Sequence, residues 1–211
     1  MRIVWKIFFN VIIFCLSSNA KAEYDSRIEG PYFLPTWLSN VAFQVSNWTG
    51  QTLIKDESMM GHFVSDKILA DLKTSRSLPL FKDQLWQANL AEIQRDDIVN
   101  IMPLERIHSI DVSHLVYVLM AHEGQPNISV DGPDPIGINE LIKKLSPLST
   151  VPLRCAARCV GKVQIDSPRP VSAKRSLMIL ERALLQAGLR VVRVADSAVV
   201  ETLGGKGAPG Q

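Results

Sequence analysis

The sequence predicts an α+β fold made of two small repeated modules, in which helices pack on short mixed sheets. A helix-spaced apolar stripe at residues 38–45 recurs 100 residues later at residues 138–145, and strand-like segments begin at both Gly61 and Gly161. Each copy is expected to have a helix, a short strand, a glycine-led strand, a second helix and a closing hairpin, in a βαββαββ-like order. A chance alignment of two amphipathic helices is the alternative, since few identities support the match.

The first 22 residues have the composition of a secretory signal peptide. Arg2 and Lys6 give a positive start, residues 7–16 are mostly apolar, and residues 20–22 (Ala-Lys-Ala) follow the small-x-small rule for cleavage before Glu23. A retained membrane anchor is the alternative, but the apolar run is shorter than the ~20 residues that span a bilayer. We therefore expect an exported chain.

The signal peptide also changes the charge balance. Arg2, Lys6 and Lys21 leave with it, so 23 basic side chains become 20 against 21 acidic ones, a net charge of −1. Residues 23–150 carry 10 basic and 17 acidic groups (−7), whereas residues 151–211 carry 10 basic and 4 acidic groups (+6). This polarity can steer association with a partner or with another copy of the chain. Two ordinary solvated surfaces are the alternative.

About 189 residues remain after cleavage, which suits two small domains better than one large core. The predicted organisation is a signal peptide at residues 1–22, a first module at 23–106, a second module at 107–203 and a flexible glycine-rich tail at 204–211.

Cys155 and Cys159 are the only cysteines of the mature chain. In an oxidising compartment they form a candidate disulfide, although their spacing needs a bent loop. Two free thiols remain an alternative, and a metal site lacks a second cysteine pair or a nearby histidine.

The first module is expected to begin with a helix that ends at Gly50, because glycine is common just after a helix. Pro79 must interrupt the second helix or start a new one. The predicted elements are a helix at 37–46, strands at 51–55 and 61–65, a helix at 68–87, and a hairpin of 90–94 with 98–102.

In the second module, residues 109–111 offer a helix start, and an apolar face follows as far as Gly124 (Val112, Leu115, Val116, Leu119). A strand at 127–130, turns at 131–135 and a helix at 137–145 come next. A strand is then expected at 161–166.

Ser172 is the expected N-cap of the last helix, whose apolar face is Ala173, Leu177, Leu180, Leu184 and Ala187. Gly188 ends this helix, and strands at 189–194 and 198–203 form the closing hairpin. Arg182, Arg190 and Arg193 occupy polar positions, so replacing all three with Glu is expected to weaken association while the fold survives.

No enzyme signature is present: the sequence has no nucleophile elbow, HExxH, dinucleotide fingerprint or zinc cluster. His108, Asp111 and His114 form the one cluster with a catalytic or metal-binding appearance, and a polar loop with a solvent-facing helix start is its alternative. Trp37, Trp48 and Trp86 are expected in the core rather than on a stacking surface.

Residues 161–172 are Gly-Lys-Val-Gln-Ile-Asp-Ser-Pro-Arg-Pro-Val-Ser, and an amphipathic helix, a glycine and a valine-rich hairpin follow. This order resembles the periplasmic N-terminal domains of secretins, the outer-membrane channel proteins of type II and related secretion systems. Residues 101–116 are similar to the strand and helix that open the next such domain, and residues 128–145 to its closing strand and helix. The resemblance covers most of residues 30–203.

Secretins continue into further N-domains and a membrane-inserting β-domain, whereas this sequence stops at the glycine-rich tail. Channel formation is therefore not carried over, and we expect a truncated or split secretin. The resemblance implies a non-enzymatic, periplasmic, outer-membrane-associated component of protein transport that contacts inner-membrane components or exported protein.

The partners it implies are other secretion-system proteins, further copies of the chain in a ring, and a separate channel subunit. Nucleic acid, small-molecule substrates and cofactors are not expected. The alternatives are a periplasmic signalling or adaptor domain unconnected with secretion, and an unrecognised periplasmic enzyme that depends on Asp111 or His114.

Overall fold

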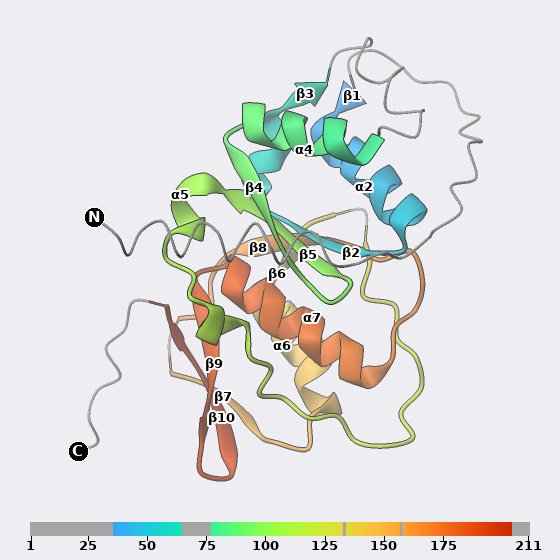
Figure 1. Ribbon diagram of the computed structural model, residues 1–211. Coiled ribbons are helices and arrows are strands. Elements are labelled where there is room, and N and C mark those ends of the chain that lie inside the picture. Colours follow the sequence, from blue (N-terminus) through green and yellow to red (C-terminus); the bar gives the residue numbers. More distant parts are fainter. Residues whose placement is uncertain (1–35, 65–76, 133, 157, 204–211) are drawn as a thin grey trace.

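Sheets and helices alternate in layers through the molecule (Figure 1). The computed structural model describes residues 36–64, 77–132, 134–156 and 158–203. We call the described residues up to 106 the first half and those from 107 to 203 the second half. In Figure 1 the layers run from β1 and β3 at the top, through α2 and α4, a central sheet, and α6 and α7, to β7, β9 and β10 at the bottom.

The first outer layer is a two-stranded sheet, in which β1 (Thr36–Trp37) pairs antiparallel with β3 (Phe63–Val64). Beneath it lie α2 (Leu38–Thr49) and α4 (Ser77–Gln87). Gly50 ends α2 in the left-handed conformation, with φ of 70°, and donates its N–H to the carbonyl of Ser46. The predicted first helix and its terminating glycine are confirmed.

The central sheet has five strands, in the order β4-β5-β2-β8-β6. Only β2 and β5 run parallel within it; the other neighbours are antiparallel. Its members are β2 (Thr52–Lys55), β4 (Leu90–Arg95), β5 (Ile98–Pro103), β6 (Ile136–Gly137) and β8 (Lys162–Asp166). The first half thus supplies three strands and the second half two.

On the other face of this sheet lie α6 (Ile138–Leu145) and α7 (Ala173–Gln186). Below them is a three-stranded sheet of order β7-β10-β9, made of β7 (Leu153–Cys155), β9 (Leu189–Val194) and β10 (Ser197–Thr202). β7 runs parallel to β10, and β9 antiparallel to it. Short helical turns complete the fold: η1 (Glu57–Gly61), α5 (Leu104–Ile107), η2 (Val112–Leu115) and η3 (Ser146–Leu148).

Two hydrophobic cores lie on the two faces of the central sheet, because its strands alternate their side chains between the faces. Leu53 of β2 joins α2 and α4 in one core, and its neighbour Ile54 joins α6 and α7 in the other. Both residues are at most 1% exposed.

The order of elements and the strand pairing are alike in the two halves. β1 pairs with β3 as β6 pairs with β8, and β2-β5-β4 has the directions of β7-β10-β9. The α+β class is confirmed. That the halves are copies of one module stays a prediction.

The structure corrects two elements of the second module. The helix expected from 109–111 to Gly124 is only the single turn η2, and the strand expected at 127–130 is one isolated bridge between Ile128 and Val171. The N–H groups of Val118 and Leu119 donate to the carboxylate of Glu181, so they are not available for a helix. The signal peptide, the glycine-rich tail and residues 68–76 lie outside the described residues.

Candidate functional site

The two halves meet along one backbone seam, where β2 pairs antiparallel with β8. Beside it, Lys55 Nζ lies 2.5 Å from Asp166 Oδ2, and both side chains are at most 3% exposed. Lys55 also donates to the carbonyl of Ser39 at 3.1 Å. Burial lowers the pKa of Lys55 and raises that of Asp166, and their mutual attraction opposes both shifts. The pair holds the two halves together, because separating them or removing one partner would leave an unpaired buried charge.

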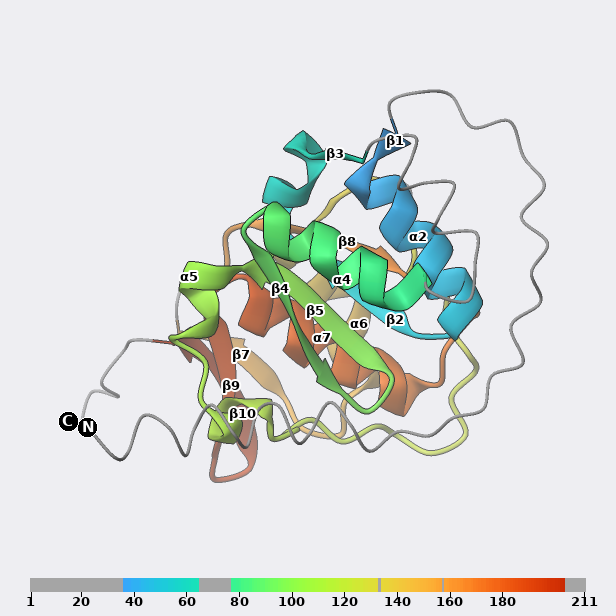
Figure 2. The ribbon, with the colours of Figure 1, turned by 45° about the horizontal axis from the view of Figure 1, so that its top comes forward.

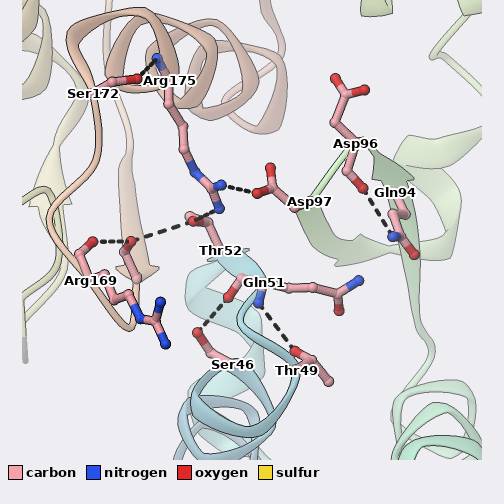
Figure 3. A network of polar contacts seen from close by, with 11 residues as sticks. Ser46, Thr49, Gln51, Thr52, Gln94, Asp96, Asp97, Arg169, Ser172 and Arg175 are labelled. Carbon is pink, nitrogen blue, oxygen red and sulfur yellow. Dashed lines mark hydrogen bonds and ion pairs between the residues drawn. The ribbon is translucent and has the colours of Figure 1, made fainter. Parts of the chain in front are cut away.

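A second polar network joins the start of α7 to the first half (Figure 3). Arg175 pairs with Asp97 in the β4–β5 turn and donates to Thr52 Oγ1 at 2.9 Å, while Thr52 Oγ1 lies 3.4 Å from Ser167 Oγ. Ser172 caps α7, as predicted, by accepting from the N–H of Arg175. The network therefore ties β2, the β4–β5 turn and α7 together.

Polar side chains of α7 also reach the central sheet. Gln186 Nε2 donates to the carbonyl of Ile101 at 2.6 Å, and Asn100 Nδ2 donates to Gln186 Oε1 at 2.6 Å. Arg182 is 1% exposed and donates to the carbonyl of Ile93, and burial lowers its pKa to about 10. The expectation that Arg182 is a surface residue is wrong, because α7 lies between two sheets.

The other two arginines of that expected surface group behave differently. Arg190 pairs with Glu201 on the neighbouring strand, with Nη2 2.5 Å from Oε1, and Arg193 is exposed. Reversing all three arginines would therefore bury a new carboxylate at position 182 and cannot leave the fold intact.

Residues 116–122 cross α7 as an extended strap. Glu181, 8% exposed, accepts from the N–H groups of Val118 and Leu119 at 2.9 and 2.7 Å. Burial raises its pKa to about 7, although these hydrogen bonds and Arg95 act in the opposite direction. Arg95 also lies 5.0 Å from the centre of the Tyr117 ring and donates to the carbonyl of Leu115. A titratable carboxylate thus holds the strap.

The candidate histidine cluster has a local structural role. Asp111 caps η2 by accepting from the N–H of Ser113, and His114 Nδ1 accepts from the N–H of Asp111. His108 ends α5. Within the described ranges no three His, Cys, Asp or Glu side chains are placed to hold a metal ion.

Cys155 and Cys159 are both thiols in the structure. Cys155 is exposed on β7, Cys159 is buried, and a hydrogen bond joins their side chains. Burial raises the pKa of Cys159 to about 12, so this sulfur stays protonated at neutral pH. The thiols are neighbours, and the disulfide between them stays a prediction.

Several aromatic side chains of the first half are exposed, which contradicts the core assignment for two of the three tryptophans. Trp37 is 41% and Trp86 66% exposed, whereas Trp48 packs against the core. The rings of Trp37 and Phe63 lie 3.7 Å apart at their centres, on β1 and β3. Exposed apolar surface of this kind is typical of sites that contact another protein or a ligand.

The described surface includes the following two shallow depressions. The first, about 260 Å³, lies where the halves meet and is lined by residues that include Asp56, Arg106, Lys162 and Gln186. The second, about 210 Å³, lies beside β3 and is lined by His62, Phe63, Gln87 and Ala88 among others.

None of the helices in the described part of the chain is both long and apolar enough to cross a bilayer. We found no match for the chain among protein-family models, curated proteins or solved structures.

Proposed function

We propose that the protein is a non-enzymatic periplasmic component of a bacterial secretion system, resembling the N-terminal ring domains of secretins. The order of elements after residue 160 carries the proposal. β8 contains the Lys-Val strand that follows Gly161, the Ser-Pro-Arg-Pro bend comes next, and α7 and the β9–β10 hairpin complete the order of the resemblance.

The surface is of a kind that supports contact with inner-membrane components, exported protein or further subunits. β7 is an edge strand whose Arg154 and Cys155 are exposed, and the Trp37–Phe63 pair lies on the opposite outer sheet. Edge strands offer unpaired backbone groups that a partner's strand can extend.

Deletion of the gene in its own host tests the role in secretion. We expect one or more exported proteins to disappear from the medium while their cellular levels stay unchanged, and the full chain to restore them. The matched control is the chain without residues 1–22, which should fail because it stays in the cytoplasm. An unchanged set of exported proteins would contradict the proposal, and changed transcription alone would favour the signalling alternative.

Localisation has its own test. A reporter that is active only after export, fused behind residues 1–211, should be active, and the mature N-terminus should be Glu23. A full-length product retained in the membrane would refute the signal peptide.

A further inference from the structure

The two ends of the molecule carry the two kinds of sheet that are joined at its centre. The central sheet consists of a three-stranded unit, β4-β5-β2, and a two-stranded unit, β8-β6, joined along β2 and β8. One outer layer is a second three-stranded unit, β9-β10-β7, and the other a second two-stranded unit, β3-β1. Figures 1 and 2 place these outer sheets at opposite ends of the molecule.

β7 corresponds to β2 by its pairing. Leu53 lies opposite Val99 in β5, and Leu153 lies opposite Ala198 in β10. The carbonyl of Pro152 accepts from the N–H of Ala198, and the N–H of Ala156 donates to the carbonyl of Val200, so the backbone groups of Pro152 and Ala156 face β10. The backbone groups of Leu153 and Cys155 therefore point to the open edge, because neighbouring residues in a strand alternate.

β7 is less buried than β2, because β2 has a neighbouring strand on each side and, in the described part of the chain, β7 has one on a single side. All four residues of β2, whose edge β8 covers, are buried. In β7, Leu153 is half-buried, and Arg154 and Cys155 are exposed. Among the described residues no strand pairs with this edge of β7.

The first-half surface around β3 corresponds to the second-half surface at the start of β8, which faces Asp56 and Glu57 just after β2. β2 itself pairs with Gln164, Ile165 and Asp166, farther along β8. The backbone carbonyl of His62 accepts from the N–H of Leu38, and the backbone carbonyl of Gly161 accepts in the same way from the N–H of Ile138. The depression of about 210 Å³ beside β3 is lined by residues that correspond to second-half residues lining the depression of about 260 Å³, where the halves meet. The corresponding residues are His62 with Gly161, Phe63 with Lys162, Gln87 with Gln186 and Ala88 with Ala187.

We propose that copies of the chain associate head to tail, with the open edge of β7 in one copy packed on the outer face of the first half, at Phe63, in the next. The contact places a three-stranded unit against a two-stranded unit, as the internal joint does. The two surfaces lie at opposite ends, so one chain cannot satisfy both, and such a contact builds a ring or a chain of copies.

Charge favours this contact over a two-fold symmetric one. Residues 23–106 carry a formal −4 and residues 107–203 a formal +2, so head-to-tail packing brings halves of opposite formal charge together. A symmetric β7–β7 contact would place Arg154 near its own copy. The proposal rests on the strand pairing and not on the role in secretion, so each can fail alone.

Sedimentation of the chain without residues 1–22, over a concentration series with a reducing agent, tests the proposal. We expect association that grows with concentration and weakens with salt. Cys155→Pro removes the outward N–H of β7, and Cys155→Ser keeps it. Phe63→Asp changes the opposite face, and its control is Phe43→Asp, because Phe43 is 50% and Phe63 51% exposed.

We expect Cys155→Pro and Phe63→Asp each to weaken association about tenfold or more, and both controls to leave it unchanged. Mixing the two variants should give one-to-one pairs, since each keeps one intact surface. A chain that stays monomeric at every concentration, or variants that do not complement each other, would overturn the proposal. Thermal melts identify a variant that fails to fold, in which case Arg154→Glu replaces Cys155→Pro.

Discussion

At the residue scale, buried charges fix how the halves meet. Lys55 and Asp166 lie more than 100 residues apart in sequence and form a buried ion pair at the β2–β8 seam. Removing one partner of such a pair leaves an unpaired buried charge, whereas replacing both with apolar residues removes that cost. The pair is thus sensitive to single substitutions in particular.

We expect Asp166→Ala to lower the free energy of unfolding by about 3–5 kcal/mol. The double variant Lys55→Met with Asp166→Leu should lose less, because no charge is then left buried. Urea melts of the three proteins at neutral pH measure both values. A single variant no less stable than the double variant would contradict the role assigned to the pair.

Glu181 gives the fold a pH dependence. Its pKa is about 7 in the folded chain against an ordinary value of 4.5, so between these pH values the folded state holds more protons than the unfolded state. Stability should therefore fall as pH rises from 4.5 to 7, by an amount on the order of 1–3 kcal/mol from this group.

Glu181→Gln stays neutral, so this contribution to the fall in stability should be absent. The stability of the variant relative to the native chain should therefore increase as pH rises. Urea melts of both proteins between pH 4.5 and 8 test it, and parallel stability profiles would show that Glu181 stays ionised throughout.

At the element scale, α7 is the central helix of the core that α6 and α7 form against the central sheet. Leu180 is fully buried at the centre of its predicted apolar face. Leu180→Ala should cost about 2–5 kcal/mol through lost burial and the cavity that remains, out of a total of roughly 5–15 kcal/mol. Val194→Ala is the control, since Val194 is 53% exposed. Denaturant melts that show a loss below about 0.5 kcal/mol for Leu180→Ala would contradict its core position.

The apolar periodicity predicted most elements because local patterns encode them. Both hairpins, α2, α6, β8 and the serine cap of α7 follow from residues near each other in sequence. The strap at 116–122 was missed because Glu181, more than 60 residues away, binds its N–H groups.

The candidate site was less predictable for the same reason. Cys155 is found by its residue type alone. The open edge of β7 depends on which strands pair, and the buried pair of Lys55 with Asp166 has no signal in either local sequence. The central sheet likewise accounts for Arg182, which is buried and donates to the carbonyl of Ile93 although periodicity marks its position as polar.

At the scale of the whole molecule, the account's central claim is that both halves fold as one unit because the central sheet contains strands of each. The tryptophans that remain after residue 22 are Trp37, Trp48 and Trp86, all in the first half. Tryptophan fluorescence therefore reports the first half, while far-ultraviolet circular dichroism reports both. Urea unfolding followed by both signals should give coincident transitions for the native chain. A circular dichroism signal that persists in the native chain after the fluorescence transition is complete would show two independent domains and contradict the shared sheet.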